Sequence, residues 1–232
     1  MSRNRVIVIG GGAAGLMAAG QAAEAGKSVL LLEKMGQPGR KICITGKGRC
    51  NLTNIAEPTD FINHFGSNGR FLHQAFARFF SPELMTFFEG LGLPLTIERG
   101  GRVFPTCGKA PEVLKVMLKW LVGLGVEIRR QAPVGSLLLE EGRIRGVVCG
   151  GENIEGDKII LATGGASYPL TGSTGDGYRL ARQAGHSIVP IRPSLVPLET
   201  GGDLAARMAG LSLKNVGIRL FINDKCRFQG FG

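Results

Sequence analysis

The sequence predicts an α/β fold, a parallel sheet with helices, followed by the start of a second, β-rich region. Two short apolar runs at 5–10 and 28–33 are typical of buried parallel strands, and the alanine-rich stretch 13–26 between them is typical of a helix. Strand, helix and strand in such a short span form a βαβ unit. Near residue 190 the pattern changes to proline-punctuated and alternating segments, which indicates a second domain.

Further elements follow the βαβ unit in order. Helices are expected near 70–79, 81–91, 110–125 and 174–186, and a hairpin over 95–104 is expected to turn at Gly100 and Gly101. The segments "VEIRR", "PVGSLLLEEGRIRGVVCG" and "NIEGDKIILATGG" predict a β-meander that returns into a parallel strand at 158–162. Alternation in "NVGIRLFINDKCRFQGFG" predicts a second hairpin, turning at Asn223 and Asp224.

Composition narrows the class of protein. A chain of 232 residues with 44% hydrophobic residues can bury a proper core. Its five cysteines form no C-x-x-C pair, which argues against a disulfide framework or a zinc site and favours a reducing compartment. The apolar start lacks a signal-peptide cleavage site and is too short to span a membrane. We therefore expect a cytoplasmic protein with no metal and no membrane partner.

The formal charge of +10 raises the question of a polyanionic ligand. Residues 1–49 hold eight basic residues against two acidic ones, and many of the basic residues stand among glycines. This pattern suits a small polyanion such as a pyrophosphate. Aromatic residues are few, and neither a basic helix interleaved with them nor a zinc-finger spacing is evident, so no nucleic-acid partner is expected.

The first motif is G-x-G-x-x-G, formed by Gly10, Gly12 and Gly15 between the first strand and helix. The glycines permit the tight turn, the approach of a pyrophosphate and close packing of helix on strand. The helix N-terminus at Ala13 and Ala14 offers free N–H groups to phosphates. Glu33, at the end of the second strand, can accept both hydroxyls of an adenosine ribose, although a solvated strand-end charge followed by Lys34 is the alternative. The motif predicts a bound dinucleotide, with NAD and FAD both open.

The second motif is "ATGG", which begins with Ala162, Thr163 and Gly164 and follows the meander. An extended strand that ends in this way can bring the backbone back to the ligand, and glycine is needed where backbone passes close by.

Five stretches carry a resemblance to a known family: "VIVIGGGAAGLMAA", "GRKICITGKGRCNLTN", "GRVFPTCGKAPEVLKVM", "ATGGASYPLTGSTGDGYRLARQAGH" and "PSLVPL". On these the chain resembles the YhiN/BaiN-type NAD(P)/FAD-dependent oxidoreductases, also described as aminoacetone-oxidase-like flavoproteins. The resemblance implies tightly bound FAD in a Rossmann-like domain, 1–190, that is interrupted by an inserted β-rich domain beginning at 191–232. It also implies that the chain is the N-terminal portion and lacks the segment that returns to the flavin.

The resemblance implies roles for further residues. It carries Arg40 and Lys41 to the FAD phosphates, Gly46–Asn51 to the isoalloxazine and Val134 to adenine. Asp176 either reaches the cofactor or caps the N-terminus of the helix that follows it. Within "GRKICITGKGRCNLTN", expected to be a loop, Gly46 and Gly48 let backbone lie flat on a ring and Asn51 meets its polar edge. Arg49 is the candidate for stabilising negative charge on reduced flavin.

Several alternatives stay open at this point. The same stretch could be a solvated basic surface loop. Cys50 fits a packing role better than a redox role, since no partner thiol or histidine stands beside it. Arg102 either orients a substrate or lies in water, and the three histidines show no metal spacing.

The predicted function is an FAD-dependent oxidoreductase that moves hydride or electrons between a small organic substrate, or NAD(P)H, and flavin N5. No catalytic side chain is nominated apart from Arg49. The alternatives are a nicotinamide-only dehydrogenase and a truncated, non-catalytic dinucleotide-binding module. The sequence does not indicate the substrate or the oligomeric state.

Overall fold

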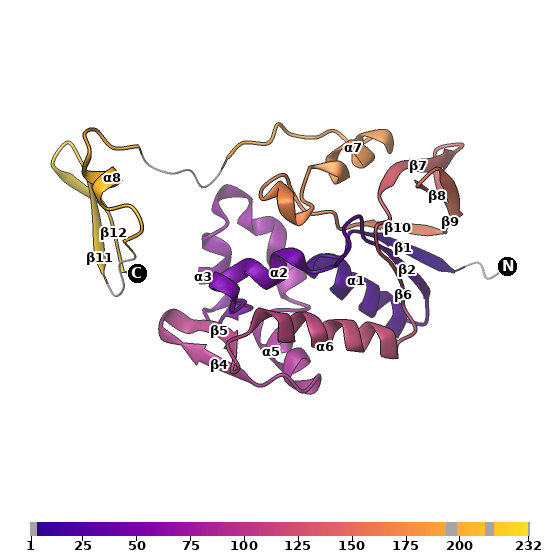
Figure 1. Ribbon diagram of the computed structural model, residues 1–232, viewed down its shortest axis with the longest axis horizontal. Helices are drawn as coiled ribbons and strands as arrows, with labels where there is room; N and C mark the ends of the chain where they lie inside the picture. The colour runs from indigo at the N-terminus through magenta and orange to yellow at the C-terminus, as the bar shows by residue number, and fades with distance from the viewer. Residues whose placement is uncertain (1–3, 194–198, 212–215, 232) are drawn as a thin grey trace. The chain divides into compact units, whose positions relative to one another are not determined.

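The computed structural model describes residues 4–193, 199–211 and 216–231 (Figure 1). The chain divides into two compact units, residues 1–188 and 189–232. Residues 194–198 of the "PSLVPL" stretch lie outside the described residues. Among the described residues, no helix combines the length and the apolar character needed to cross a membrane.

The first unit is built on a four-stranded parallel sheet. Its strands are β1 (Arg5–Ile9), β2 (Ser28–Leu32), β6 (Glu127–Arg129) and β10 (Lys158–Leu161), in the order β10-β1-β2-β6. Helix α1 (Ala13–Glu24) connects β1 to β2, which confirms the predicted βαβ unit. The "VEIRR" segment was wrongly assigned to the meander: it supplies β6, because Leu30–Leu32 of β2 pair with Glu127–Arg129 in parallel.

The sheet is buried on both faces. On one face, Val8 and Leu31 pack with Leu16 of α1 and with Val113 of α6 (Ala110–Gly123). On the other, Ile7 and Leu30 pack with residues of a β-meander and of helix α7 (Asp176–Gln183). Continuous apolar strands are the signature of a parallel sheet that is covered on both sides. Figure 1 shows the meander on the opposite side of this sheet from α1 and α6.

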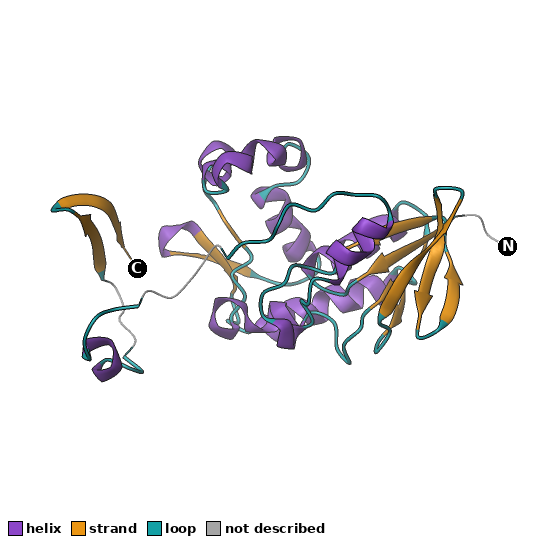
Figure 2. Cartoon of the chain, turned by 90° about the horizontal axis from the view of Figure 1, so that it is seen from above, coloured by secondary structure: helices purple, strands orange, loops and turns teal. Residues whose placement is uncertain are grey.

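The β-meander consists of β7 (Val134–Glu140), β8 (Arg143–Cys149) and β9 (Glu152–Glu155), which form a three-stranded antiparallel sheet (Figure 2). It leads directly into β10, which pairs with β1, so the predicted return to the parallel sheet is confirmed.

A mixed region lies between β2 and α6. It contains α2 (Arg40–Ile44), β3 (Thr53–Asn54), α3 (Pro58–Asn63), α4 (His73–Phe76), α5 (Ser81–Gly90), β4 (Leu95–Glu98) and β5 (Arg102–Pro105). Strands β3, β5 and β4 form an antiparallel sheet, and the β4–β5 hairpin turns at Gly100 and Gly101 as predicted, both with positive φ.

Two expectations in this region were wrong. The helix expected over 70–79 is a 3-10 helix, Gly66–Leu72, followed by the single turn α4. Phe61, Phe76 and Phe80 pack their rings together in this region, with centroids 5.0 to 5.6 Å apart. The stretch expected to be a loop begins with the short helix α2 and a 3-10 turn, Thr45–Gly48.

The second unit contains α8 (Leu204–Arg207) and the hairpin β11 (Gly217–Ile222) with β12 (Lys225–Phe231). Asn223 and Asp224 both have positive φ, 50° and 58°, as a two-residue type I′ turn requires. The predicted hairpin is thereby confirmed.

Candidate cofactor-binding site

A cleft of about 900 Å³ opens at the carboxyl ends of the parallel strands, where Ile9, Leu32 and Leu161 contribute to its wall. Ligands of open α/β sheets bind at this end of the strands. The volume is within the range of about 300–1,000 Å³ that is usual for cofactor sites. Predicted site residues that line the cleft are Gly10, Gly12, Ala13, Ala14, Glu33, Lys34, Lys41, Cys50, Asn51, Val134, Ala162, Thr163, Gly164 and Asp176.

The three glycines of the first motif have different surroundings. A Cβ on Gly10 would lie 2.5 Å from the Ala162 carbonyl oxygen, and one on Gly15 would lie 1.8 Å from the Gly10 carbonyl oxygen. Gly10 and Gly15 are therefore needed by the protein itself, for close packing of loop, strand and helix. A Cβ on Gly12 would meet no atom within 4 Å and would project into open space. The open space at Gly12 is the cradle that a pyrophosphate requires.

Helix α1 begins directly after Gly12, and its first turn carries no acidic residue. The first N–H groups of a helix lack partners within it, and they carry the positive end of the helix dipole. Gly12, Ala13 and Ala14 all line the cleft. This end of the cleft is therefore suited to an anionic group.

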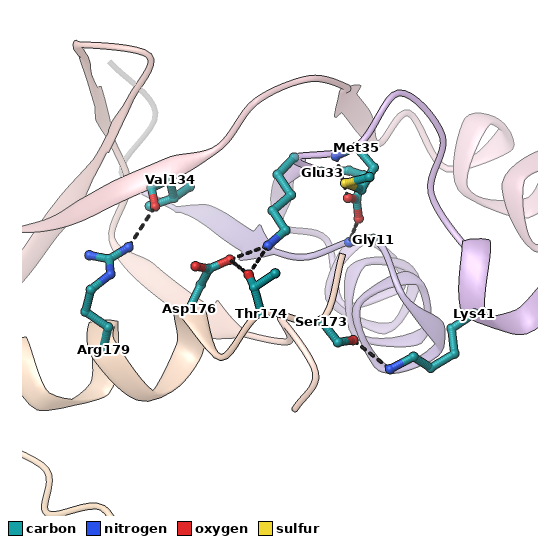
Figure 3. A network of polar contacts seen from close by, with 10 residues as sticks. Gly11, Glu33, Met35, Lys41, Val134, Ser173, Thr174, Asp176 and Arg179 are labelled. Atoms are coloured by element: carbon teal, nitrogen blue, oxygen red, sulfur yellow. Dashed lines mark hydrogen bonds and ion pairs between the residues drawn. The ribbon is translucent and has the colours of Figure 1, made fainter. Parts of the chain in front are cut away.

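Glu33 is a carboxylate held in place by backbone (Figure 3). Its side chain is buried; Oε2 accepts the Gly11 N–H at 2.7 Å and Oε1 accepts the Met35 N–H at 2.7 Å. Each carboxylate oxygen can accept a further hydrogen bond. Glu33 thus braces the glycine loop against the turn after β2 while keeping acceptor capacity for ribose hydroxyls, and the reading of a solvated strand-end charge was wrong.

Two lysines connect the β2–α2 segment to the loop before α7 (Figure 3). Lys34 Nζ donates to Thr174 Oγ1 and Asp176 Oδ2, each at 2.5 Å. Lys41 Nζ donates to Ser173 Oγ at 2.7 Å and to the Ser167 carbonyl at 3.0 Å. Burial alone would raise the pKa of Asp176, but hydrogen bonds from Lys34 and Thr174 hold it below its usual value. Asp176 is the first residue of α7, whose N-cap is Gly175, so its carboxylate is not the helix cap.

Some residues of the basic stretch 39–54 line the cleft, whereas Arg49 contacts the β4–β5 hairpin. Cys50 and Asn51 line the cleft. Arg49 instead donates from Nη1 to Glu98 Oε1 at 2.7 Å, and its guanidinium lies 4.2 Å from the Phe104 ring centroid. Gly15, Arg40, Gly46, Gly48 and Arg49 are not among the described residues that line the cleft.

Cys50 lines the cleft as a buried thiol with a left-handed backbone, φ 62°. Burial raises the pKa of this thiol, although a hydrogen bond with Thr45 acts in the opposite direction. A protonated, buried thiol is a small packing group and a poor nucleophile.

The loop after β10 and the start of the meander complete the wall. Ala162, Thr163 and Gly164 line the cleft next to Gly10. Val134 is buried there, and its carbonyl accepts Arg179 Nη2 at 3.4 Å, while the Gly135 carbonyl accepts Arg179 Nη1 at 2.5 Å. Arg179 thereby fastens α7 to β7.

An apolar wall was missed by the sequence interpretation. It consists of residues from α1, α5, α6 and the segment between α4 and α5: Met17, Phe79, Leu84, Phe88, Val113 and Met117. Only Met17 had a usable signal, since it lies one helical turn beyond Ala13 on α1 and shares its face. Leu84, Phe88, Val113 and Met117 follow the apolar spacing of ordinary core helices, and Phe79 lies between two helices.

Other candidate side chains lie elsewhere. Arg102 is exposed and donates from Nε to the Arg99 carbonyl at 3.2 Å. His64 is exposed and donates from Nδ1 to the Asp60 carbonyl at 2.7 Å. Among the described residues, no group of three or more His, Cys, Asp or Glu side chains could hold a metal ion.

A parallel sheet with a β-meander crossover, an open glycine cradle and a braced strand-end carboxylate define a dinucleotide-binding domain of the flavoprotein type. The family model described as the HI0933-like protein Rossmann domain matches residues 4–225. The chain therefore belongs to the HI0933-like family, the YhiN/BaiN-type FAD-dependent oxidoreductases. This confirms the family resemblance predicted from the sequence.

Two curated relatives are similar over most of this chain. The 3-dehydro-bile acid delta(4,6)-reductase of Clostridium scindens is 37% identical over 212 residues, which cover 90% of this chain and 50% of the relative. The ribosomal RNA dihydrouridine synthase of Escherichia coli is 32% identical over 221 residues, which cover 93% of this chain and 54% of the relative. The chain thus spans about half the length of the curated relatives it matches.

A solved structure supports the fold. A flavocytochrome c3 fumarate reductase in an open conformation matches with a TM-score of 0.59 and 23% identity, covering 80% of this chain and 41% of the other. At this identity the likeness concerns the fold alone.

Proposed function

We propose that the chain holds FAD in the cleft and forms part of an enzyme that reduces a carbon–carbon double bond conjugated to a carbonyl. The observation that carries the cofactor assignment is the open cradle at Gly12 beside the braced Glu33. The names of both curated relatives describe reduction of a double bond, in a bile acid and in uridine, and each such bond is conjugated to a carbonyl.

Different residues would bind different parts of the cofactor. Gly12, Ala13 and Ala14, at the N-terminus of α1, would bind the pyrophosphate together with Lys41, and Glu33 would accept the ribose hydroxyls. Val134 would contact adenine, and Ala162–Gly164 with Cys50 and Asn51 would line the flavin. Arg40, Gly46, Gly48 and Arg49 lie outside the cleft wall, so any action on the flavin would be through their neighbours.

The chemistry divides between cofactor and protein. Bound FAD would supply the two-electron hydride chemistry between NAD(P)H and the conjugated alkene, and the added proton would come from water. The chain's own residues bind and orient the dinucleotide. The apolar wall of Phe79, Phe88 and Met117 would limit access of water to the side of the cleft that it lines.

The test is an absorption spectrum of the purified chain after incubation with FAD and desalting. A retained flavin spectrum that bleaches with NAD(P)H under anaerobic conditions would support the proposal. Retained flavin that NAD(P)H does not reduce would favour the alternative in which this chain is a non-catalytic dinucleotide-binding module. Binding of NAD with no retention of FAD would favour the nicotinamide-only dehydrogenase.

A small apolar enone is the first substrate class, because the cleft wall is mainly apolar. A base in RNA is a second candidate, favoured by the segment 61–80. No Asp or Glu occurs between Asp60 and Glu83, and Arg70 and Arg78 are exposed. Phe71 is 88% exposed, and Phe79 lines the cleft. The segment 61–80 therefore carries exposed aromatic and basic side chains and also contributes to the cleft wall. Aromatic side chains beside positive charge are a common platform for unpaired bases.

The two substrate classes are separable by binding. Fluorescence titration with a short uridine-containing RNA and with a steroid enone would be compared for the chain and for Phe71→Ala and Arg70→Gln. Val122→Ala, an exposed residue on α6, is the control. Weaker RNA binding in the first two variants alone would favour RNA, and binding of the enone alone would support the small-molecule class and the expected absence of a nucleic-acid partner.

Two further predictions belong with this function. We propose that the hairpin β11–β12 begins the inserted β-rich domain expected from residue 191. We also keep the cytoplasmic location as a prediction, supported by five cysteines that are all free thiols.

A further inference from the structure

The loop between β10 and α7 contains a short flap in the wall of the cleft. Ser173 and Thr174 lie between Gly172 and Gly175, whose φ angles are 101° and 81°. Only glycine adopts such angles readily, so the flap turns sharply at both ends. Ser173 is buried, and Gly172, Ser173 and Asp176 line the cleft. We define residues 172–175 as the flap.

Each hydroxyl of the flap is held by a different lysine. Lys41 donates to Ser173 Oγ and Lys34 donates to Thr174 Oγ1. Lys34 lies in the β2–α2 connection, which also carries Glu33, and Lys41 lies in the first turn of α2. The flap is therefore fastened to the side of the cleft where Glu33 lies, at the proposed adenosine end.

Asp176 completes the attachment of Lys34. Its Oδ2 accepts Lys34 Nζ at 2.5 Å and Thr174 Oγ1 at 3.0 Å, so one carboxylate oxygen orients both the lysine and the flap hydroxyl. The side chains of Lys34 and Asp176 are 25% and 34% exposed. A charge-assisted pair that is partly withdrawn from water is stronger than a fully exposed one.

We propose that Asp176 is a positioning residue: acting through Lys34, it keeps the flap closed beside the adenosine end and slows the escape of a bound dinucleotide. This inference rests on the proposed function. It differs from the role expected from the sequence, in which Asp176 contacts the cofactor, because Oδ2 of Asp176 accepts hydrogen bonds from Lys34 and Thr174. An ammonium group has three donors, so Lys34 keeps one N–H for a ligand in the cleft.

The experiment measures dissociation rates of FAD by stopped-flow fluorescence for the chain, for Asp176→Asn and Lys34→Met, and for the charge-exchanged double variant Lys34→Asp with Asp176→Lys. Glu112→Gln and Lys115→Met, an exposed pair on α6 with Nζ 3.2 Å from Oε2, are the matched controls. FMN, which lacks the adenosine half, and 5′-ADP, which lacks the flavin half, are titrated in parallel.

We expect FAD to leave each single variant about tenfold faster, a change typical of losing a charged hydrogen bond that is partly screened. The charge-exchanged variant should recover at least half of the loss on a logarithmic scale. Binding of 5′-ADP should weaken in the single variants while binding of FMN stays unchanged. The control pair should behave like the unmodified chain, and thermal melts establish that every variant is folded.

The inference would be overturned by unchanged FAD dissociation in both single variants, by equal weakening for FMN, or by no recovery in the charge-exchanged variant. Failure of the unmodified chain to bind FAD would instead contradict the proposed function. In that case the 5′-ADP titration still tests the flap.

Discussion

The two ends of the cleft are built in different ways. The polar end uses backbone groups and a few charges: the open cradle at Gly12, the carboxylate of Glu33 and the ammonium of Lys34. The apolar end uses buried side chains that also belong to the protein core, such as Phe88 and Met117. Binding and stability therefore separate at the glycine cradle of the polar end and coincide at the apolar end.

The largest effect is expected at the apolar end, from Phe88→Ala. Phe88 is 3% exposed and packs in the core, so its truncation should lower the free energy of unfolding by about 3–5 kcal/mol. Urea unfolding followed by circular dichroism measures this. Phe79→Ala is the control, since Phe79 lines the same cleft but is 40% exposed. Equal destabilisation in the two variants would contradict the conclusion that Phe88 belongs to the protein core as well as to the cleft wall.

At the polar end, Gly12→Val should abolish tight binding without unfolding the chain. The added side chain would occupy open space, and φ at Gly12 is −77°, which valine adopts without strain. FAD affinity should fall about 100-fold or more, equivalent to about 2.7 kcal/mol. Fluorescence titration and a thermal melt are the two measurements.

Gly15→Ala is the matched control for the cradle. Its Cβ would lie 1.8 Å from the Gly10 carbonyl oxygen, so it should lower the melting temperature rather than affinity alone. An unchanged melting temperature for Gly15→Ala, or an unfolded Gly12→Val variant, would contradict the assignment of Gly15 to packing and of Gly12 to ligand binding.

Glu33→Gln should affect both properties moderately. One side-chain atom would change from an acceptor to an NH₂ group facing a backbone N–H, which costs about 1–3 kcal/mol of unfolding free energy. FAD affinity should also fall, because the ribose loses an acceptor. Titration and urea unfolding of the same sample distinguish the two effects; Glu155→Gln, at an exposed position in the meander, is the control.

The smallest effect concerns pH and the Asp176 pair. The pKa of Asp176 is lowered by the folded structure, where Lys34, Thr174 and Arg179 act on its carboxylate. A group with a lowered folded-state pKa stabilises the fold above its ordinary pKa, 3.8, and loses that contribution as pH falls below it. Unfolding curves of the chain and of Asp176→Asn should therefore differ at pH 6 and converge below pH 3.8. A constant difference across this range would argue against an ionised Asp176 in the fold.

Local signals were sufficient at the polar end. Gly10, Gly12 and Glu33 act through their own backbone and through partners placed by adjacent strands, so their spacing along the chain predicted their position. Arg49 shows where this fails. Its partners Glu98 and Phe104 come from a hairpin about fifty residues away, and nothing near Arg49 in the chain indicates them. The strand β6 was missed for a similar reason, since only its pairing with β2 distinguishes it from the meander.

Residue pattern alone determined the α/β class, the βαβ unit, the meander returning to β10 and the glycine cradle, because hydrophobic period and glycine placement are properties of local backbone. Tertiary structure decided the rest: which apolar side chains line the cleft rather than the core, that Arg49 turns to the hairpin, and that Asp176 meets Lys34. Those contacts join residues far apart in the chain, and their formation depends on packing of several elements at once rather than on the preference of any one segment.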